Sequence, residues 1–269
     1  MDQGIYDIPF EEYLKIDAFS KSGADQIQKS PMHYQAYLRD GIEDTSSMIL
    51  GRATHSGLLE PKKFYDSYIA RPEGLDLRTK IGKEAFAELQ AANPGKEMLS
   101  HDQYQQVDRM IHEVYSHAVA SQLLTSGKAE QSLVWVDPEH KVLCKGRADY
   151  IRSDNVVIDI KTTVNASPKE FERSIGKYRY HVQNCVYSYG LQQILGSALE
   201  SYIIIAIESD SPHGIGIYTL DDKTIDLGRA LYRANLETYA ECLKTGKWPG
   251  YSQEIKTLSV PPWAFTEAG

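Results

Sequence analysis

The sequence predicts an α/β or α+β fold, in which a central mixed β-sheet is packed against helices. Residues 1–126 show mainly helical spacing of apolar residues, and residues 127–160 contain three β-type runs joined by short turns. Helical and strand-like segments then follow one another to about residue 244. This order differs from the regular strand and helix alternation of a doubly wound sheet, so we expect a sandwich of helices and strands.

The N-terminal part contains the first expected helices. Ser20 and Ser30 stand where helices begin, and Pro31 suits a first helical turn because its missing amide has no partner there. Pro61 opens a further short segment in the same way. Apolar residues at three- and four-residue steps predict longer helices at 46–60, 80–92 and 100–124, the last ending at Gly127.

The C-terminal part contains the expected strands. Three strands form an antiparallel meander, and the turn residues Ser153-Asp154-Asn155 join the second of them to the third. Two helices, two strands and a long helix follow. The strands are expected at 131–136, 142–151, 156–160, 201–208 and 215–220, and the helices at 168–175, 180–195 and 222–244.

Composition and charge exclude several classes of protein. With 269 residues, 42% hydrophobic and 25% charged, the chain is neither disordered nor collagen-like, and its longest apolar run, at residues 202–207, is too short to span a membrane. The N-terminus lacks a secretion signal and the three cysteines lack metal-binding spacing, so we expect a cytoplasmic protein with no membrane partner. The net charge is −8, but residues 141–183 carry nine Lys and Arg against five acids.

Two aspartates and a lysine are expected to converge in the meander. If the turn places Arg152 opposite Val156, then Asp149 faces Asp159, and Lys161 points to the same face. Paired carboxylates repel each other unless a cation or a proton lies between them. A surface ladder of salt bridges with Arg147 and Lys161 is one possible explanation.

A divalent metal is the other explanation. Asp159 follows an apolar run of β-branched residues, where a charged side chain needs a strong partner. Asp149, Asp159 and the Ile160 carbonyl would offer the oxygen ligands that Mg²⁺ and Mn²⁺ prefer. Lys161 could then hold or deprotonate an attacking water, or stabilise a pentavalent phosphate, in phosphodiester hydrolysis assisted by two ions.

Five short motifs connect these residues to a known family. They are Gly51-Arg52-Ala53-Thr54-His55, Glu130, Gly146-Arg147-Ala148-Asp149, Asp159-Ile160-Lys161-Thr162-Thr163, and Tyr180-His181-Val182-Gln183 with Tyr187. In order, they resemble the motifs of the RecE-type exonuclease domain (exonuclease VIII), within the PD-(D/E)xK, lambda-exonuclease-like superfamily. Ala148 departs from the proline of the general signature. The likeness extends to residues 4–9 at the start, and to Trp248-Pro249, Leu258 and Pro262-Trp263-Ala264 at the end.

The resemblance implies a restriction-endonuclease-like core and specific roles for residues. It implies one stand-alone nuclease domain over residues 1–269, divided into a mainly helical part (1–126), a catalytic core (127–246) and a tail (247–269). The implied metal ligands are His55, Asp149, Asp159 and the Ile160 carbonyl, with Lys161 catalytic and Glu130 orienting a metal-bound water or a second ion. A lone helical histidine is often only a core residue, so the role of His55 depends on its motif.

Further residues are expected to support the site or to contact DNA. Gln183 and Tyr187 share a helix face and, by the resemblance, orient Lys161 or the scissile phosphate; ordinary helix packing is the alternative. Ser20, Lys21 and Ser22 could hold a DNA 5′-phosphate or simply cap a helix. We expect backbone contacts without sequence specificity from the basic residues around the site, which are Arg147, Lys161, Lys177 and Arg179.

The implied activity is a Mg²⁺-dependent exonuclease with two ions per site, in which Mn²⁺ can substitute. It would degrade double-stranded DNA from 5′ to 3′ and leave a 3′ strand for a single-strand annealing protein of RecT type. A homo-oligomeric ring, a tetramer or trimer, would place positive charge only where DNA passes. Two alternatives are a catalytically silent DNA-end-binding recombination adaptor and another PD-(D/E)xK nuclease with a different substrate preference.

Overall fold

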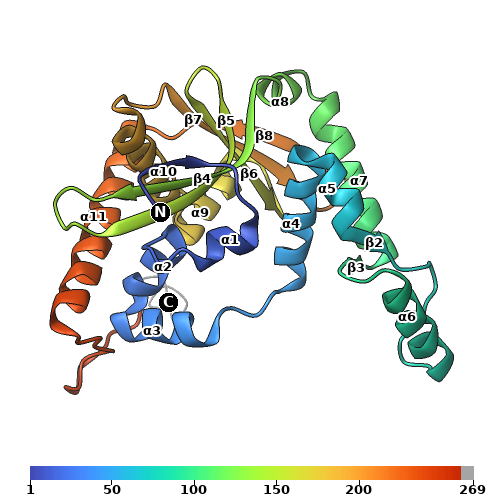
Figure 1. Ribbon diagram of the computed structural model, residues 1–269, viewed down its shortest axis with the longest axis horizontal. Helices are drawn as coiled ribbons and strands as arrows, with labels where there is room; N and C mark the ends of the chain where they lie inside the picture. The colour runs from blue at the N-terminus through green and yellow to red at the C-terminus, as the bar shows by residue number, and fades with distance from the viewer. Residues whose placement is uncertain (262–269) are drawn as a thin grey trace, which may run out of the picture.

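A six-stranded mixed sheet forms the centre of the computed structural model, which describes residues 1–261 (Figure 1). The strands lie in the order β1-β4-β5-β6-β7-β8, and all neighbours are antiparallel except β6 and β7. They span Gly4–Tyr6 (β1), Gly127–Val136 (β4), Leu143–Arg152 (β5), Val156–Thr163 (β6), Ser201–Glu208 (β7) and Ile215–Tyr218 (β8). A small parallel sheet pairs β2 (Tyr68–Ala70) with β3 (Glu97–Leu99).

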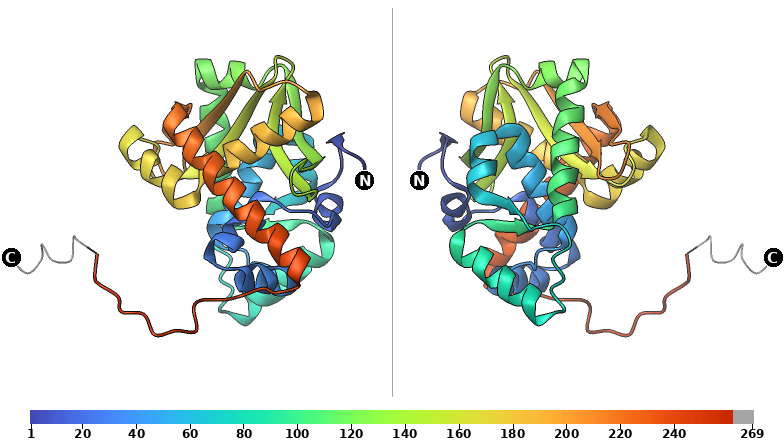
Figure 2. Two further views of the ribbon diagram at one scale, coloured as in Figure 1. Left: turned by 90° about the vertical axis from the view of Figure 1, so that its left-hand side faces the viewer. Right: turned by 90° about the vertical axis from the view of Figure 1, so that its right-hand side faces the viewer.

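Helices cover both faces of the central sheet (Figures 1 and 2). On one face, α2, α3, α9, α10 and α11 enclose a core that contains Trp135, Phe171 and Tyr232. On the other face, α4, α5, α7 and α8 enclose a core that contains Met110 and Ile160. The helices span Phe10–Lys15 (α1), Lys21–Lys29 (α2), Pro31–Asp40 (α3), Ser46–Leu59 (α4), Pro61–Ser67 (α5), Lys80–Ala92 (α6), His101–Ser116 (α7), Ala118–Leu123 (α8), Pro168–Tyr178 (α9), Tyr180–Leu195 (α10) and Asp222–Thr245 (α11).

Most expected boundaries agree with the structure to within a few residues. Ser20 and Ser30 accept hydrogen bonds from backbone N–H groups three residues ahead, and they therefore cap α2 and α3 as their positions predict. The antiparallel meander is β4, β5 and β6. The parallel β6 and β7 need a long crossover, which α9 and α10 supply.

Two expectations about residues 100–127 are wrong. The single helix over 100–124 is interrupted at His117, whose backbone is extended with ψ of 115°. The His117 side chain accepts a hydrogen bond from Ala120 N–H and so caps α8, which makes the break a helix start. Gly127 does not end a helix but opens β4, where a Cβ atom would lie only 2.4 Å from the Ile151 carbonyl oxygen.

The sequence gives no signal for β1, α1, β2 and β3. Each has three to six residues, which is too short for a periodic pattern to be seen. Long-range contacts hold α1 in place instead. The Lys145 ammonium, on β5, donates hydrogen bonds to the carbonyls of Tyr13, Leu14 and Ile16 at the end of α1, at 2.7–3.3 Å.

The chain after α11 returns to the body of the molecule through an aromatic contact. Trp248 stacks on Tyr34 of α3 with ring centroids 5.5 Å apart. The Pro262-Trp263-Ala264 motif lies outside the described residues.

None of the helices within residues 1–261 combines the length and the apolar character needed to cross a bilayer.

Candidate metal centre

The backbone pairing between β5 and β6 stops where the two aspartates begin. Tyr150 pairs with Ile158 and Ile151 with Val157, which confirms the register expected from the turn. One step further, this register places Asp149 opposite Asp159, but no backbone pair joins them. Instead, Asp149 Oδ2 accepts a hydrogen bond of 2.7 Å from the Ile160 N–H. A side-chain carboxylate thus takes the place of a backbone acceptor at this point of the sheet.

Glu130 extends the same row onto β4. The pairs on either side of it place Glu130 opposite Asp149, again without a backbone pair between them. Glu130 has φ of 52°, in the left-handed region, which costs a residue with a side chain roughly 1–3 kcal/mol. The carboxylates of Glu130, Asp149 and Asp159 therefore occupy one row across three strands, where the sheet is locally interrupted.

His55 joins two of these carboxylates from α4. One potential ligand atom from each of His55, Glu130 and Asp149 lies within 4.8 Å of the other two, and we call these residues the three-ligand cluster. His55 Nδ1 is 3.6 Å from Asp149 Oδ2. α4 approaches β6 closely at Gly51, where a Cβ atom would lie 3.3 Å from the Thr162 hydroxyl.

The electrostatics of the three-ligand cluster favour a bound cation. Burial and, next, the charge of Asp159 raise the pKa of Asp149 to about 7. Burial and the charge of Asp149 also raise the pKa of Glu130. Burial and the charge of Lys161 lower the pKa of His55, which leaves a neutral imidazole with a lone pair for a metal. Two oxygen donors and one nitrogen donor fit a divalent cation, which would relieve the repulsion between the carboxylates.

Asp159 has different partners. Its side chain is fully buried, and the Lys161 ammonium lies 2.6 Å from Asp159 Oδ2. The Gln183 side-chain amide donates hydrogen bonds to Asp159 Oδ1 at 2.8 Å and to the Tyr187 hydroxyl at 3.1 Å. Burial by itself lowers the pKa of Lys161, but the charges of Asp159 and Asp149 outweigh it and raise that pKa, so the side chain is an ammonium.

The structure does not bring all of the expected metal ligands together. Of the four expected ligands, His55 and Asp149 lie together, but their third neighbour is Glu130, while Asp159 is held by Lys161 and Gln183. Ile160 presents its N–H to Asp149. The alternative of a surface salt-bridge ladder is right only in pairing Lys161 with Asp159. It is wrong in the rest, because Asp159 is fully buried and Arg147 pairs with Glu130.

Two arginines expected at the DNA backbone instead bind protein groups. Arg147 Nε donates to Glu130 Oε2 at 2.7 Å, and the side chain is 9% exposed. Arg179 lies between α9 and α10 and donates to Asp25 and Asn235. Lys177 is exposed to solvent. Arg147 therefore orients a member of the three-ligand cluster, and Arg179 joins α10 to α2 and α11.

The start of α2 borders the site, but its polar groups serve the protein. Ser20 caps the helix, and Ser22 is exposed. Lys21 Nζ is 2.7 Å from Asp25 Oδ2 and donates to the Tyr178 carbonyl at 2.8 Å. Burial lowers the pKa of Lys21, and the nearby charge of Lys161 adds to this effect. These contacts therefore match the alternative in which the segment simply caps a helix.

Two tyrosines lie beside the site although the sequence predicts no role for them. The Tyr180 ring centre is 5.1 Å from Lys161 Nζ, and its only signal was its place in the motif with Gln183. Tyr202, on β7, pairs with Val157 and has a buried hydroxyl without a hydrogen bond. Burial and the charge of Asp159 raise the pKa of Tyr202 well above its usual value. The pairing of β6 with β7 brings Tyr202 here, and no local pattern marks it.

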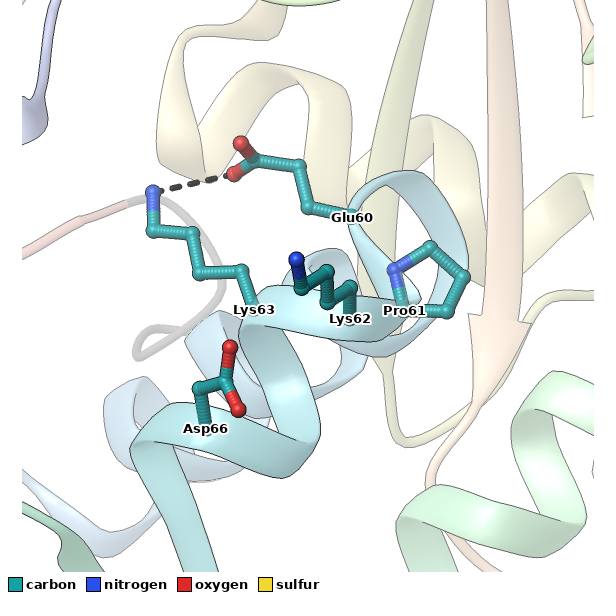
Figure 3. Close-up of a pocket in the computed structure, with 5 residues that line it drawn as sticks. All are labelled: Glu60, Pro61, Lys62, Lys63 and Asp66. Atoms are coloured by element: carbon teal, nitrogen blue, oxygen red, sulfur yellow. Dashed lines mark hydrogen bonds and ion pairs between the residues drawn. The ribbon is translucent and has the colours of Figure 1, made fainter.

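A surface hollow of about 350 Å³ lies at the start of α5, away from this chemistry (Figure 3). Glu60, Pro61, Lys62, Lys63 and Asp66 line it, and Lys63 pairs with Glu60 at 3.0 Å. It contains none of the site residues described above, so we assign it no function.

The raised pKa of Asp149 predicts how stability depends on pH without metal. Asp149 titrates near 3.8 when unfolded and near 7 when folded, so between these values the folded chain keeps a proton that the unfolded chain has released. The free energy of unfolding should therefore fall as pH rises through this window, by up to about 4 kcal/mol from this group. Urea unfolding in EDTA at pH 5 and pH 8 measures this, and an equal pH difference in Asp149→Asn would contradict the assignment.

Comparisons with known proteins identify relatives of this fold. The family model described as a PDDEXK-like domain of unknown function (DUF3799) matches residues 20–260. A crystal structure from Eubacterium rectale, of a protein provisionally named an exonuclease, aligns with a TM-score of 0.64 at 13% identity and covers 97% of this chain and 98% of that one. A phage-related exonuclease from Haemophilus somnus 129PT aligns with a TM-score of 0.35 at 13% identity, over 63% of this chain and 85% of that one. No curated protein matches. The family match and the first structure confirm the expected fold class.

Proposed function

Because the chain belongs to the DUF3799 family of PDDEXK-like domains, we propose that it is a Mg²⁺-dependent exonuclease that degrades double-stranded DNA from 5′ to 3′. The observation that carries this proposal is the row of Glu130, Asp149 and Asp159 in the interrupted sheet, with His55 and Lys161 beside it. A buried group of carboxylates with one lysine suits hydrolysis of a phosphodiester, whose reaction builds negative charge.

The chain's own residues divide this work. His55, Glu130 and Asp149 would hold the metal, which supplies Lewis-acid polarisation of a phosphoryl oxygen when bound. Arg147 fixes the orientation of Glu130, and the Ile160 N–H fixes that of Asp149. Mg²⁺ is the proposed ion, with Mn²⁺ as a substitute and a second ion near Glu130 or Asp159.

Lys161 provides a positive charge and hydrogen-bond donors. Because neighbouring carboxylates raise its pKa, it holds a water or a phosphoryl oxygen and does not take up a proton in the metal-free site. Asp159 keeps the ammonium in place, and Gln183 keeps Asp159 in place. Tyr187 supports Gln183 in turn, since its hydroxyl accepts a hydrogen bond from the amide.

The preference for DNA ends rests on the resemblance to the RecE-type domain. The same resemblance supports a homo-oligomeric ring of three or four subunits and a RecT-type annealing partner for the 3′ strand produced. The charge distribution fits this proposal, because residues 141–183 are basic within a chain of net charge −8. Arg147, Arg179 and Lys21 bind protein groups and Lys161 lies in the site itself, so the exposed Lys177 is the predicted cation left for a phosphate contact outside the site.

Digestion of labelled DNA tests the proposal. A linear duplex labelled at one 5′ end is incubated with Mg²⁺ or EDTA, beside a covalently closed circle, with Lys161→Met as the control for contaminating nucleases. Metal-dependent release of labelled mononucleotide from the linear duplex alone is the expected result. Cleavage of the circle would point to another kind of PD-(D/E)xK nuclease, and two intact substrates would favour the silent adaptor.

A further inference from the structure

Two tyrosines and two lysines form a row that leads from the buried site to the surface. The Tyr180 ring centre is 5.1 Å from Lys161 Nζ, and the rings of Tyr180 and Tyr178 are stacked with centroids 5.7 Å apart and an angle of 25°. Lys177 Nζ lies 5.0 Å from the Tyr178 ring centre. We call Lys161, Tyr180, Tyr178 and Lys177 the cation–aromatic row.

The row passes from the protein interior to solvent. The Lys161 side chain is 14% exposed, whereas Tyr178 is 48% exposed and Lys177 is exposed. Neither tyrosine hydroxyl takes part in a hydrogen bond within residues 1–261. Simple core packing therefore accounts for the inner ring but not for the outer one.

The protein anchors the Tyr180 ring and the backbone that carries both tyrosines. The Tyr180 ring centroid lies 6.0 Å from that of the fully buried Phe171, whose ring stacks on Tyr218. The Tyr178 carbonyl accepts a hydrogen bond from Lys21. Between the two tyrosines, Arg179 has left-handed dihedrals of 57° and 43° and is tied to Ala24 and Asp25. Because the Tyr178 ring is stacked on an anchored neighbour, it loses less conformational entropy than an unsupported side chain when a flat ligand stacks on it.

We propose that this row is a platform for the unpaired end of a DNA strand, in which a base stacks on Tyr178 and Lys177 contacts the adjoining phosphate. The proposal deepens the function proposed above and rests on it. The row consists of two stacked aromatic rings with a cation at each end. A DNA strand offers the complementary groups, because its phosphates attract cations and every base has a face for stacking. A ligand with both features fits this surface better than an apolar one.

The platform has a clear role in the reaction. Asp159 is fully buried and Lys161 is only 14% exposed, so the reacting phosphate has to enter a recessed site. A strand end that is free of its complement can enter such a site more readily than a strand held in a rigid duplex. Stacking on Tyr178 compensates part of the energy lost when the terminal bases unpair. The row therefore favours frayed ends over closed ones, without regard to sequence.

Binding in EDTA tests the proposal without any need for cleavage. Three fluorescent hairpin duplexes are compared by anisotropy: one blunt, one with two unpaired 5′-terminal nucleotides, and one with two abasic sites in their place. The natural chain should bind the unpaired bases about tenfold more tightly than the abasic sites, and Tyr178→Ala should bind both equally. Tyr178→Phe should retain the preference, as should Tyr65→Ala, which removes an exposed tyrosine on α5.

The outcomes separate the two proposals. A base preference that persists in Tyr178→Ala, or is missing in the natural chain, would overturn the platform even if the enzyme digests DNA. A base preference that depends on Tyr178, in a protein that does not digest DNA with Mg²⁺, would support the platform and reject the exonuclease. A preference for unpaired 3′ ends in a matched set of hairpins would assign the platform to the other strand. Absence of binding to every probe would count against both proposals.

Discussion

Replacement of Lys161 by methionine is expected to lower nuclease activity by about 10²–10⁴-fold. The ammonium lies 2.6 Å from Asp159 Oδ2 and is the charged donor closest to the carboxylate row. Methionine has a similar length but cannot donate a hydrogen bond or stabilise negative charge on a phosphate. Release of acid-soluble nucleotide from linear duplex with Mg²⁺ measures the effect. Lys169→Met, which removes an exposed lysine from α9, is the matched control and should retain full activity.

The same change should also reveal what the lysine does for stability. Without Lys161, Asp159 is a buried carboxylate with no cation beside it, and breaking such a pair costs about 3–5 kcal/mol. Lys161→Arg keeps the positive charge, so it should unfold near the natural midpoint while its larger guanidinium misplaces the donor. Low activity in a stable Lys161→Arg protein would show that the position of the donor matters. Near-natural activity in Lys161→Met would reject its catalytic role.

Replacement of Asp149 by asparagine is expected to abolish metal binding and activity while it stabilises the metal-free protein. Asp149 is the member of the three-ligand cluster that faces both Glu130 and Asp159, and burial raises its pKa to about 7. Asparagine is neutral and nearly isosteric, so the repulsion disappears together with a metal ligand. We expect Mn²⁺ affinity in calorimetry to fall at least about 100-fold, and the free energy of unfolding at pH 8 in EDTA to rise by about 1–4 kcal/mol.

A control on the same hairpin makes this result specific. Asp154 lies in the turn between β5 and β6, where its exposed carboxylate pairs with Arg152 at 2.9 Å. Asp154→Asn should change neither Mn²⁺ binding nor activity. If Asp149→Asn binds Mn²⁺ as the natural chain does, the three-ligand cluster is not the metal site.

The interrupted sheet explains why Asp149→Asn should both abolish metal binding and stabilise the metal-free protein. A continuous ladder would place backbone pairs between β4, β5 and β6 at this row, but the chain puts three carboxylates there and keeps Glu130 at a positive φ. Such strain is retained when the surrounding structure enforces it and the site needs it. A site that binds a cation through several carboxylates is expected to destabilise the protein when no cation is bound.

The sequence by itself determined the order of the longer elements and the register of the hairpin. Apolar periodicity, serine caps and prolines are local signals. They predicted where α2 and α3 begin, and both ends of α4 and α10 to within one residue. The turn at residues 153–155 determined that Asp149 and Asp159 share a row, because two strands joined by a short turn have little freedom to slip. The family motifs added His55, Glu130 and Gln183 to the candidate site.

The tertiary structure alone decided which of these residues act together. Glu130 joins His55 and Asp149 because its backbone is left-handed and α4 packs closely on β6, and neither feature is visible in a local pattern. Arg147 turns to Glu130 and Arg179 to Asp25, since each finds its partner far away along the chain. The cation–aromatic row likewise forms where α9 and α10 meet β6. Contacts between distant segments set the partners of Glu130, Arg147 and Arg179 and bring Lys161 to Tyr180, and the spacing of residues along one segment carries no information about them.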